Sequence, residues 1–324
     1  MEEMDEYASA HLVALVQRAL AAQGIHTVAP TSAGALLPFR AKHRFLTGVA
    51  REHGLMPLLR VGAALSAYSS DPAVSALLGS VTPHDLFERW QRLERFTHSR
   101  HRVVVRERGA VYLVAEHVGP PGAPPDPAAD ALVLGVLTAL LALCGARDIT
   151  VDAGRGGSGP VTVFSGGGFT APPPGLDSGL WRFTWSHTAP PAAAARAQEP
   201  GQDAVSRARR LLAADPARRW TLGGLAAELG VPPRSLQRRL AGAGGFGGLL
   251  GRVRTEAAAE LLMRSGHSVS VIGFACGYAD QPHFTRHFKL RTAMTPAAYR
   301  SAFRQPAPGE RGGPTHVPTK RRTP

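Results

Sequence analysis

The sequence predicts an α+β N-terminal domain of helices plus a small sheet, followed by an all-α domain with two helix-turn-helix motifs. Three observations predict this division. The net charge of +13 is uneven, since residues 1–200 hold 17 basic and 17 acidic side chains and residues 201–324 hold 20 and 7. The apolar periodicity changes from helical to alternating near residue 100, and one helical pattern occurs twice after residue 220. A chain of 324 residues has the length of two domains.

The first hundred residues are predicted to be mainly helical. Residues 7–23 form an amphipathic pattern that Gly24 ends. The inward positions of that helix are Leu12, Leu15, Val16 and Leu20. Helical pattern continues to about Arg100 and includes Asp85–Phe96.

Charged and histidine side chains in this part have ordinary interpretations. The carboxylates of Asp85–Phe96 stand beside arginines at helical spacing, so ion pairs within the helix explain them better than acid–base catalysis. His98 and His101, three residues apart before the first predicted strand, are expected to lie at the surface.

Alternating patterns then predict a sheet. HRVVVRER and AVYLVAEHV flank Gly109 and predict the two strands of a hairpin. A proline-rich loop leads into an apolar helix at 128–145, and DITVD and VTVF predict two short strands. The uncharged run Ala131–Ala146, at 16 residues, is short for a membrane span and fits a buried helix.

Composition predicts the domain boundaries. Residues 1–195 form the first domain, residues 196–202 a linker rich in alanine and proline, and residues 203–304 the helical domain. Residues 305–324 contain five prolines and no apolar periodicity, which predicts a disordered basic tail with Lys320, Arg321 and Arg322 near its end.

The repeated pattern lies in LAAELGVPPRSLQRRL at 225–240 and IGFACGYADQPHFTRHF at 272–288. Each copy has a short apolar helix, a glycine suited to a left-handed helix end, and a second helix with proline in its first turn. Inward anchors four residues apart follow in both copies. This is the pattern of a helix-turn-helix motif, present twice.

The outward positions of the second helices carry side chains that suit base recognition. Arg238 and Arg286 stand two residues after the first inward anchor, preceded by Gln237 and Thr285. Arginine pairs bidentately with guanine and glutamine with adenine in the major groove, while threonine offers a hydroxyl and a methyl group. A solvated helix face is the alternative, which the duplication and the charge step disfavour.

The stretches VSVIGFACGYADQPHFTRHFKLRTAMTPAAYR at 269–300 and WTLGGLAAELGVPPRSLQRRLAGAG at 220–244 resemble the DNA-binding part of AraC/XylS-type transcription regulators. The resemblance covers 203–304 and implies seven helices, with helix 246–265 linking two heads that enter successive major grooves. It implies phosphate contacts by Lys289, Arg252 and Arg254. The residues it implies for contact with bases are Arg234, Gln237, Arg238, Gln281, His283, Thr285 and Arg286, and Ser235 is a further DNA-binding candidate.

The order of helices, hairpin, apolar helix and strands in 1–195 resembles the arabinose-binding-type domain of a subset of that family, which implies an effector-sensing or dimerisation role. The resemblance implies double-stranded DNA as partner and RNA polymerase as a further one. A small-molecule effector of unknown identity and a homodimer fit it. Activation and repression stay open. The chain departs from the family pattern at Gly223, Gly224, Gly273 and Ala293.

Other chemistry is not predicted. GAGGFG at 242–247 follows a helix, so it lacks the strand–turn–helix context of a dinucleotide site. His283 and His287 lack a nearby carboxylate or cysteine to complete a metal site. No catalytic residue, cofactor or membrane contact is predicted, and a cytoplasmic protein is expected. The alternative is a DNA-repair or other enzyme fused to an AraC-like module, for which Cys144 would have to be reactive.

Overall fold

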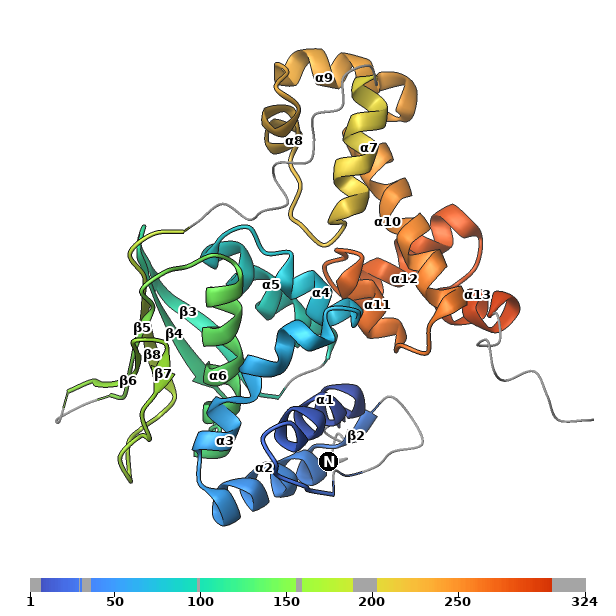
Figure 1. Cartoon of the computed structure of the whole chain (residues 1–324). Helices are drawn as coiled ribbons and strands as arrows, with labels where there is room; N and C mark the ends of the chain where they lie inside the picture. The colour runs from blue at the N-terminus through green and yellow to red at the C-terminus, as the bar shows by residue number, and fades with distance from the viewer. Residues whose placement is uncertain are drawn as a thin grey trace, which may run out of the picture.

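The computed structural model describes residues 7–28, 30, 36–97, 100–155, 159–188 and 203–304. Two regions follow one another along the chain, an N-terminal region with a sheet and a C-terminal region of helices (Figure 1). The predicted linker at 196–202 and the predicted tail at 305–324 lie outside the described residues.

The N-terminal region begins with a strand pair and a group of helices. Their bounds are β1 (Tyr7–Ser9), α1 (Ala10–Ala21), β2 (Leu36–Pro38), α2 (Phe39–His53), α3 (Met56–Leu59), the 3-10 helix η1 (Val61–Tyr68), α4 (Pro72–Leu78) and α5 (Pro83–Phe96). The first helix begins three residues later than predicted, because Tyr7–Ser9 pairs with Leu36–Pro38 as an antiparallel strand. Gly24 follows α1 with φ 80°, a conformation that favours glycine.

A six-stranded antiparallel sheet follows, larger than the small sheet that the sequence predicts. Its strands are β3 (Arg102–Arg108), β4 (Tyr112–Val118), β5 (Thr150–Ala153), β6 (Val161–Ser165), β7 (Gly168–Phe169) and β8 (Leu180–Thr184), in the order β3-β4-β8-β5-β6-β7. The hairpin and the two short strands are as predicted. β8 was not predicted, yet it lies in the middle of the sheet between β4 and β5.

Helices α5 and α6 (Pro127–Leu143) cover one face of the sheet. Phe87 of α5 meets Phe183 of β8 with ring centroids 5.4 Å apart. His117 of β4 hydrogen-bonds Asp130 of α6 at 2.8 Å. Along β4, buried and half-buried residues alternate, as expected for a sheet with one covered face.

The C-terminal region consists of helices, most of them capped by a side chain. Their bounds are α7 (Ala204–Ala214), α8 (Leu222–Leu229), α9 (Pro233–Leu240), α10 (Gly245–Arg264), α11 (Val269–Ala275), α12 (Gln281–Thr292) and α13 (Pro296–Phe303), with the 3-10 turn η3 (Ala241–Ala243). The capping residues are Asp203, Thr221, Ser268, Asp280 and Thr295, each accepting backbone N–H groups of the first turn. α10 links α7–α9 to α11–α13, as the resemblance implies.

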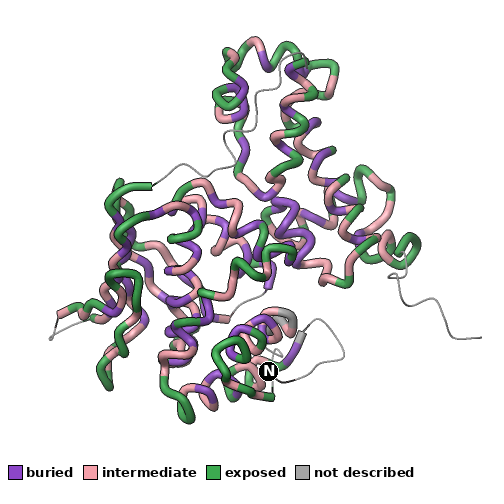
Figure 2. Tube along the Cα trace, in the orientation of Figure 1, coloured by how far each residue is buried: buried purple, intermediate pink, exposed green. Residues whose placement is uncertain are grey.

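Among the described residues, buried apolar side chains form two cores. Figure 2 shows where buried residues lie along the chain. The smaller core joins α7, α8, α9 and the first half of α10. The larger core runs from the N-terminal helices and sheet into α11 and α12, where Ile272, Phe284 and Phe288 are all completely buried. α11 and α12 are therefore packed as one body with the N-terminal region, whereas α8 and α9 are packed apart from it.

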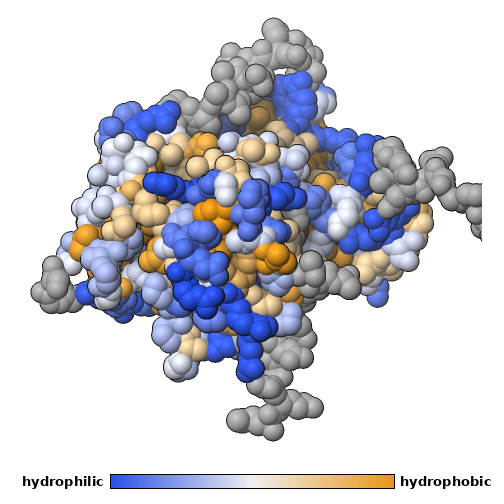
Figure 3. Space-filling view, turned by 60° about the horizontal axis from the view of Figure 1, so that its bottom comes forward, coloured by the Kyte–Doolittle hydropathy of each residue, from blue (hydrophilic) through white to orange (hydrophobic). Residues whose placement is uncertain are grey.

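On the face that Figure 3 shows, apolar side chains form small patches between hydrophilic ones. Across the described ranges, no helix combines the length and the apolar character that crossing a bilayer requires.

Candidate nucleic-acid interface

The two repeated segments form helix pairs with the same local design. The first pair is α8 and α9, and the second is α11 and α12. Gly230 and Gly277 follow the first helix of each pair with φ 66° and 78°, so each turn uses the left-handed conformation that glycine adopts at low cost. Pro233 and Pro282 lie in the first turn of α9 and α12, where no intrahelical N–H is lost.

Helix α9 is held by Leu236 and Leu240, which are completely buried. The predicted site residues stand on the rest of its surface. Arg234, Gln237 and Arg238 are exposed, and Ser235 is half-buried. Because Leu236 and Leu240 lie four residues apart, they share one narrow buried face of α9, and the rest of the helix surface is polar.

Helix α12 is anchored by Phe284 and Phe288, whose rings meet edge to face with centroids 5.6 Å apart. Arg286 and Lys289 are exposed, and Thr285 is half-buried. The first turn is more enclosed. Gln281 is half-buried, and its Oε1 is buried with no hydrogen-bond partner in the described part of the chain. The side-chain carbonyl of Gln281 is therefore not exposed to solvent.

His283 is fixed by its own turn. Its Nδ1 accepts a hydrogen bond from the backbone N–H of Ala279 at 3.2 Å, and its ring meets that of His287 with centroids 4.4 Å apart. Burial, with the neighbouring ring and the charge of Arg286, lowers the pKa of His283. Burial and nearby arginines lower the pKa of His287 in the same direction. Within the described residues, no group of three or more His, Cys, Asp or Glu side chains is arranged to hold a metal ion.

Exposed cations without a partner gather on the two second helices. Counting only described partners, six arginine and lysine side chains of α9 and α12 have neither an ion pair nor a hydrogen bond. They are Arg234, Arg238, Arg239, Arg286, Lys289 and Arg291. Other arginines of the region pair with carboxylates, as Arg218 does with Glu228 at 2.8 Å. The sequence prediction missed Arg239 and Arg291, although both are exposed on the two helices.

The predicted phosphate contact by Arg254 is wrong. Its guanidinium donates from Nε to the carbonyl of Pro216 at 3.1 Å and from Nη2 to that of Arg218 at 3.2 Å. Burial lowers its pKa, which is the mark of an enclosed side chain. The half-buried guanidinium ties the turn after α7 to α10, and its hydrogen bonds to these two carbonyl groups compete with any contact to a phosphate. Arg252 is exposed and donates to the carbonyl of Ala243.

Helix α11 is the contact between the second pair and the N-terminal region, and it packs against α4 and α5 (Figure 1). Gly273 lies at the closest point. A Cβ there would stand 2.7 Å from Phe96 of α5 and 2.7 Å from Phe284 of α12. The glycine that departs from the family pattern therefore permits this approach between α11 and α5.

A buried ion pair joins the N-terminal region to the turn after α7. Arg89 of α5 has no exposed surface, and its guanidinium donates to both carboxylate oxygens of Asp215, at 3.0 and 2.7 Å. It also donates to Asp85 at 3.1 Å and to the carbonyl of Ala76 at 2.7 Å. Burial alone would lower the pKa of Arg89, but the hydrogen bonds and charges of Asp215 and Asp85 raise it.

The prediction that ion pairs within the helix explain the charges of α5 is mostly wrong. Besides Arg89, Arg92 donates to the carbonyl of Ala217 at 2.6 Å, and Glu88 pairs with Arg219 at 3.4 Å. Glu94 accepts the backbone N–H of Val103 at 3.0 Å. Their partners lie outside α5, and spacing along one helix carries no information about them.

Ala293 ends α12 with φ 60°, in the left-handed region where a Cβ is strained. We expect Ala293→Gly to stabilise the protein by about 1 kcal/mol, measured as the free energy of unfolding in urea. The control is Ala227→Gly on the exposed face of α8, which we expect to destabilise by about 0.5–1 kcal/mol. A destabilising Ala293→Gly would contradict the strain.

Residues 225–302 match a family model described as a helix-turn-helix domain. The chain is 33% identical to the urease operon transcriptional activator of Escherichia coli over 108 residues, which cover 33% of this chain and 36% of that protein. It is 31% identical to the HTH-type transcriptional regulator GadX of Escherichia coli O6:H1 over 93 residues, or 28% of this chain and 34% of that one. The match spans about a third of the length of both relatives.

Among solved structures, the chain is similar to the C-terminal domain of AraT, a response regulator from Geobacillus stearothermophilus. The identity is 29%, the TM-score is 0.31, and the match covers 36% of this chain and 98% of that one.

Proposed function

We propose that this protein is a sequence-specific DNA-binding transcription regulator of the AraC/XylS type. Both helix pairs serve as helix-turn-helix motifs, and α9 and α12 enter the major groove. The base contacts come from the exposed side chains of these helices, above all Arg238 and Arg286, and Lys289 binds a phosphate. The matched helix-turn-helix model and the two regulators that resemble this chain support the proposal.

The observation that carries it is the set of six exposed cations on α9 and α12 that have no partner among the described residues. Placing like charges near one another on short helices costs free energy unless a polyanion neutralises them. Each helix is fixed by two completely buried side chains on its inner face, and its outer side chains point to solvent. These buried residues are Leu236 and Leu240 in α9 and Phe284 and Phe288 in α12. Duplex DNA supplies phosphates for the cations and base edges for the arginine forks.

The N-terminal region is proposed to control the second helix pair through α11. Because α11 packs against α4 and shares a core with that region, a small molecule that moves α4 would move the second helix pair relative to the first. Contact with RNA polymerase and dimerisation with a second copy of the chain stay predictions from the resemblance. Whether the protein activates or represses transcription stays open.

The alternative of an enzyme fused to a DNA-binding module would need a reactive cysteine. Cys144 is buried, and its Sγ contacts the carbonyl oxygen of Leu141 at 3.2 Å. Burial raises the pKa of this thiol to about 11, so the thiolate is scarce at neutral pH. The same cause raises the pKa of Cys276 to about 12. Neither environment favours a nucleophile.

Genomic footprinting of the full-length protein tests the proposed function. Discrete protected sites beside a limited set of genes are expected. Uniform protection along the genome would indicate a binder without sequence preference and would contradict the proposal.

The role of Lys289 has its own test at a footprinted site. We expect Lys289→Ala to weaken binding to the specific duplex and to a random duplex by the same factor. The slope of log K against log salt should become less steep by about 0.9, the contribution of one neutralised phosphate. Fluorescence anisotropy over a range of salt concentrations measures both. A loss confined to the specific duplex would mean that Lys289 contacts a base.

A further inference from the structure

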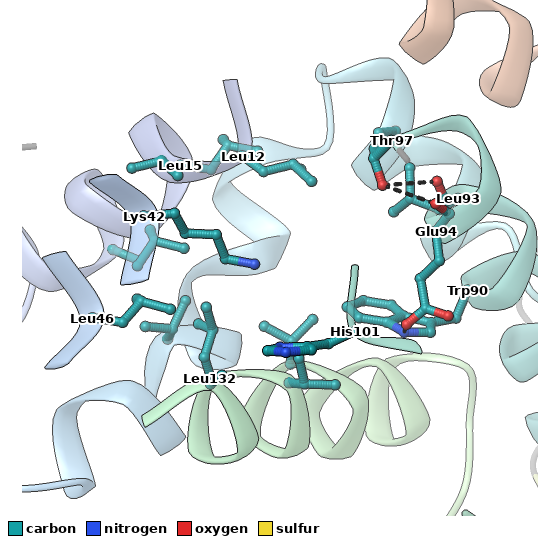
Figure 4. A pocket seen from close by; sticks show the side chains of 18 of the residues that line it. Leu12, Leu15, Lys42, Leu46, Trp90, Leu93, Glu94, Thr97, His101 and Leu132 are labelled. Carbon is teal, nitrogen blue, oxygen red and sulfur yellow. Dashed lines mark hydrogen bonds between the residues drawn. The ribbon is translucent and has the colours of Figure 1, made fainter. Parts of the chain in front are cut away.

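The N-terminal region encloses a cavity of about 160 Å³ between α1, α2, α4, α5 and α6. Its walls are mainly apolar and include Leu15 of α1, Leu46 of α2, Leu93 of α5 and Leu132 of α6 (Figure 4). Leu77 of α4 lines it as well. A well-packed interior leaves few voids of this size, and apolar cavities of similar volume bind ring-sized molecules. The cavity therefore has the size and the walls of a small-molecule site.

One cation reaches into this apolar space. Lys42 of α2 extends between α1 and α5, with its ammonium directed into the cavity (Figure 4). In the described part of the chain it forms no hydrogen bond or ion pair. Burial lowers its pKa, although the charges of Asp126 and Glu94 act in the opposite direction. An ammonium without a partner in an apolar site costs free energy unless an anion joins it.

Several other polar groups of the cavity have partners within the protein. Glu94 accepts Trp90 Nε1–H at 2.7 Å and the backbone N–H of Val103, and burial raises its pKa to about 8. His117 is hydrogen-bonded to Asp130. Arg100 lies over the ring of Phe39 at 5.4 Å. None of these groups forms an ion pair with the ammonium of Lys42 in the described part of the chain.

His101 also lines the cavity, so the expectation of a surface histidine is wrong at this position. It is 9% exposed and packs edge-on against Phe39 and His117. Burial and the neighbouring cations lower the pKa of His101 to about 4, so its ring is neutral. A neutral imidazole can donate or accept a hydrogen bond beside an anionic group held by Lys42.

We propose that this cavity binds a small molecule with an apolar body and one anionic group, and that the anionic group pairs with Lys42. Cationic ligands are disfavoured, because Lys42 and Arg100 are the cations that line the cavity within the described residues. A sugar is disfavoured as well, because its many hydroxyls would face leucine and valine walls with few partners.

The position of the cavity suits an effector of the proposed regulator, and this reading of the ligand rests on that proposed function. Ala73, Val74 and Leu77 of α4 line the cavity, and α11 packs against the same helix. α5 also lies between the cavity and α11, since its Leu93 lines the cavity and its Phe96 lies beside Gly273 of α11. A ligand that shifts α4 and α5 would therefore shift α11.

Binding to the full-length protein without DNA tests the proposal. Isothermal titration compares octanoate and 4-phenylbutyrate with 1-octanol, 4-phenylbutanol and octylamine. We expect at least one carboxylate to bind about tenfold or more tightly than its alcohol, because a charge-assisted hydrogen bond contributes that factor. Lys42→Met should remove the preference and leave binding of the alcohol. Arg44→Met, an exposed site on the same helix, is the control and should change neither.

Equal affinity for carboxylate and alcohol, tightest binding of octylamine, or an unchanged preference in Lys42→Met would overturn the proposal. So would the absence of binding by both carboxylates at millimolar concentration. A protein that binds the carboxylate but no duplex would contradict the proposed function and support the cavity site. A protein that binds a specific duplex but neither carboxylate would support the proposed function and contradict the cavity site. Amide exchange in Val269–Ala275 should change with ligand in the wild type and stay unchanged in Lys42→Met.

Discussion

Asp215→Ala is expected to destabilise the protein by about 3 kcal/mol, because it removes one of the two carboxylates that neutralise the buried guanidinium of Arg89. Arg89 would lose two hydrogen bonds and could not reach water. Asp85 would still carry a compensating charge, which places the effect at the lower end of the range for broken buried pairs. Urea unfolding followed by tryptophan fluorescence measures the change.

The matched control is Glu88→Ala. Glu88 belongs to the same helix and pairs with Arg219 across the same contact at 3.4 Å, but both side chains are partly or largely exposed. Exposed pairs contribute little, so its effect should stay below about 1 kcal/mol. An Asp215→Ala variant as stable as Glu88→Ala would show that the two regions do not depend on the buried pair.

Replacing both Arg238 and Arg286 with alanine is expected to weaken binding to a specific duplex by roughly 2–6 kcal/mol. Each bidentate contact to a base contributes about 1–3 kcal/mol, and contacts on separate helices should add. Binding to a random duplex should fall much less, because only two of many charges are lost. Fluorescence anisotropy with both duplexes measures the difference.

Arg264→Ala is the control for this experiment. Arg264 is an exposed arginine of α10 that pairs with Glu260 at 3.4 Å, four residues earlier on the same helix. Its loss should leave both affinities close to those of the wild type. Equal weakening on specific and random DNA in the double variant would mean that Arg238 and Arg286 hold only phosphates.

Local pattern predicted most of the elements because the causes were local. The hairpin followed from alternation around Gly109, and the apolar helix followed from a long run of leucine and alanine. The turns of the two helix pairs followed from Gly230 and Gly277. β8 was missed although Trp181 and Phe183 alternate with polar residues, because it stands at the end of a stretch dominated by glycine and proline.

The contacts between regions could not be predicted in this way. Arg89 and Asp215 are 126 positions apart, and no periodicity connects them. Lys42 did leave a local signal, since it occupies the same face of α2 as Phe45, Leu46 and Val49. A single charged residue on an apolar face indicates an unusual site, but only the surrounding helices show that the site is a cavity.

Selection of binding sites from a pool of random duplexes tests the central claim most directly, because it asks whether both heads read sequence. The wild-type protein should enrich two short elements whose centres lie about one helical turn apart, roughly 10 base pairs. Arg238→Ala should relax base preference in one element, and Arg286→Ala should relax it in the other. A pool without enrichment, or one element that neither variant changes, would contradict the account.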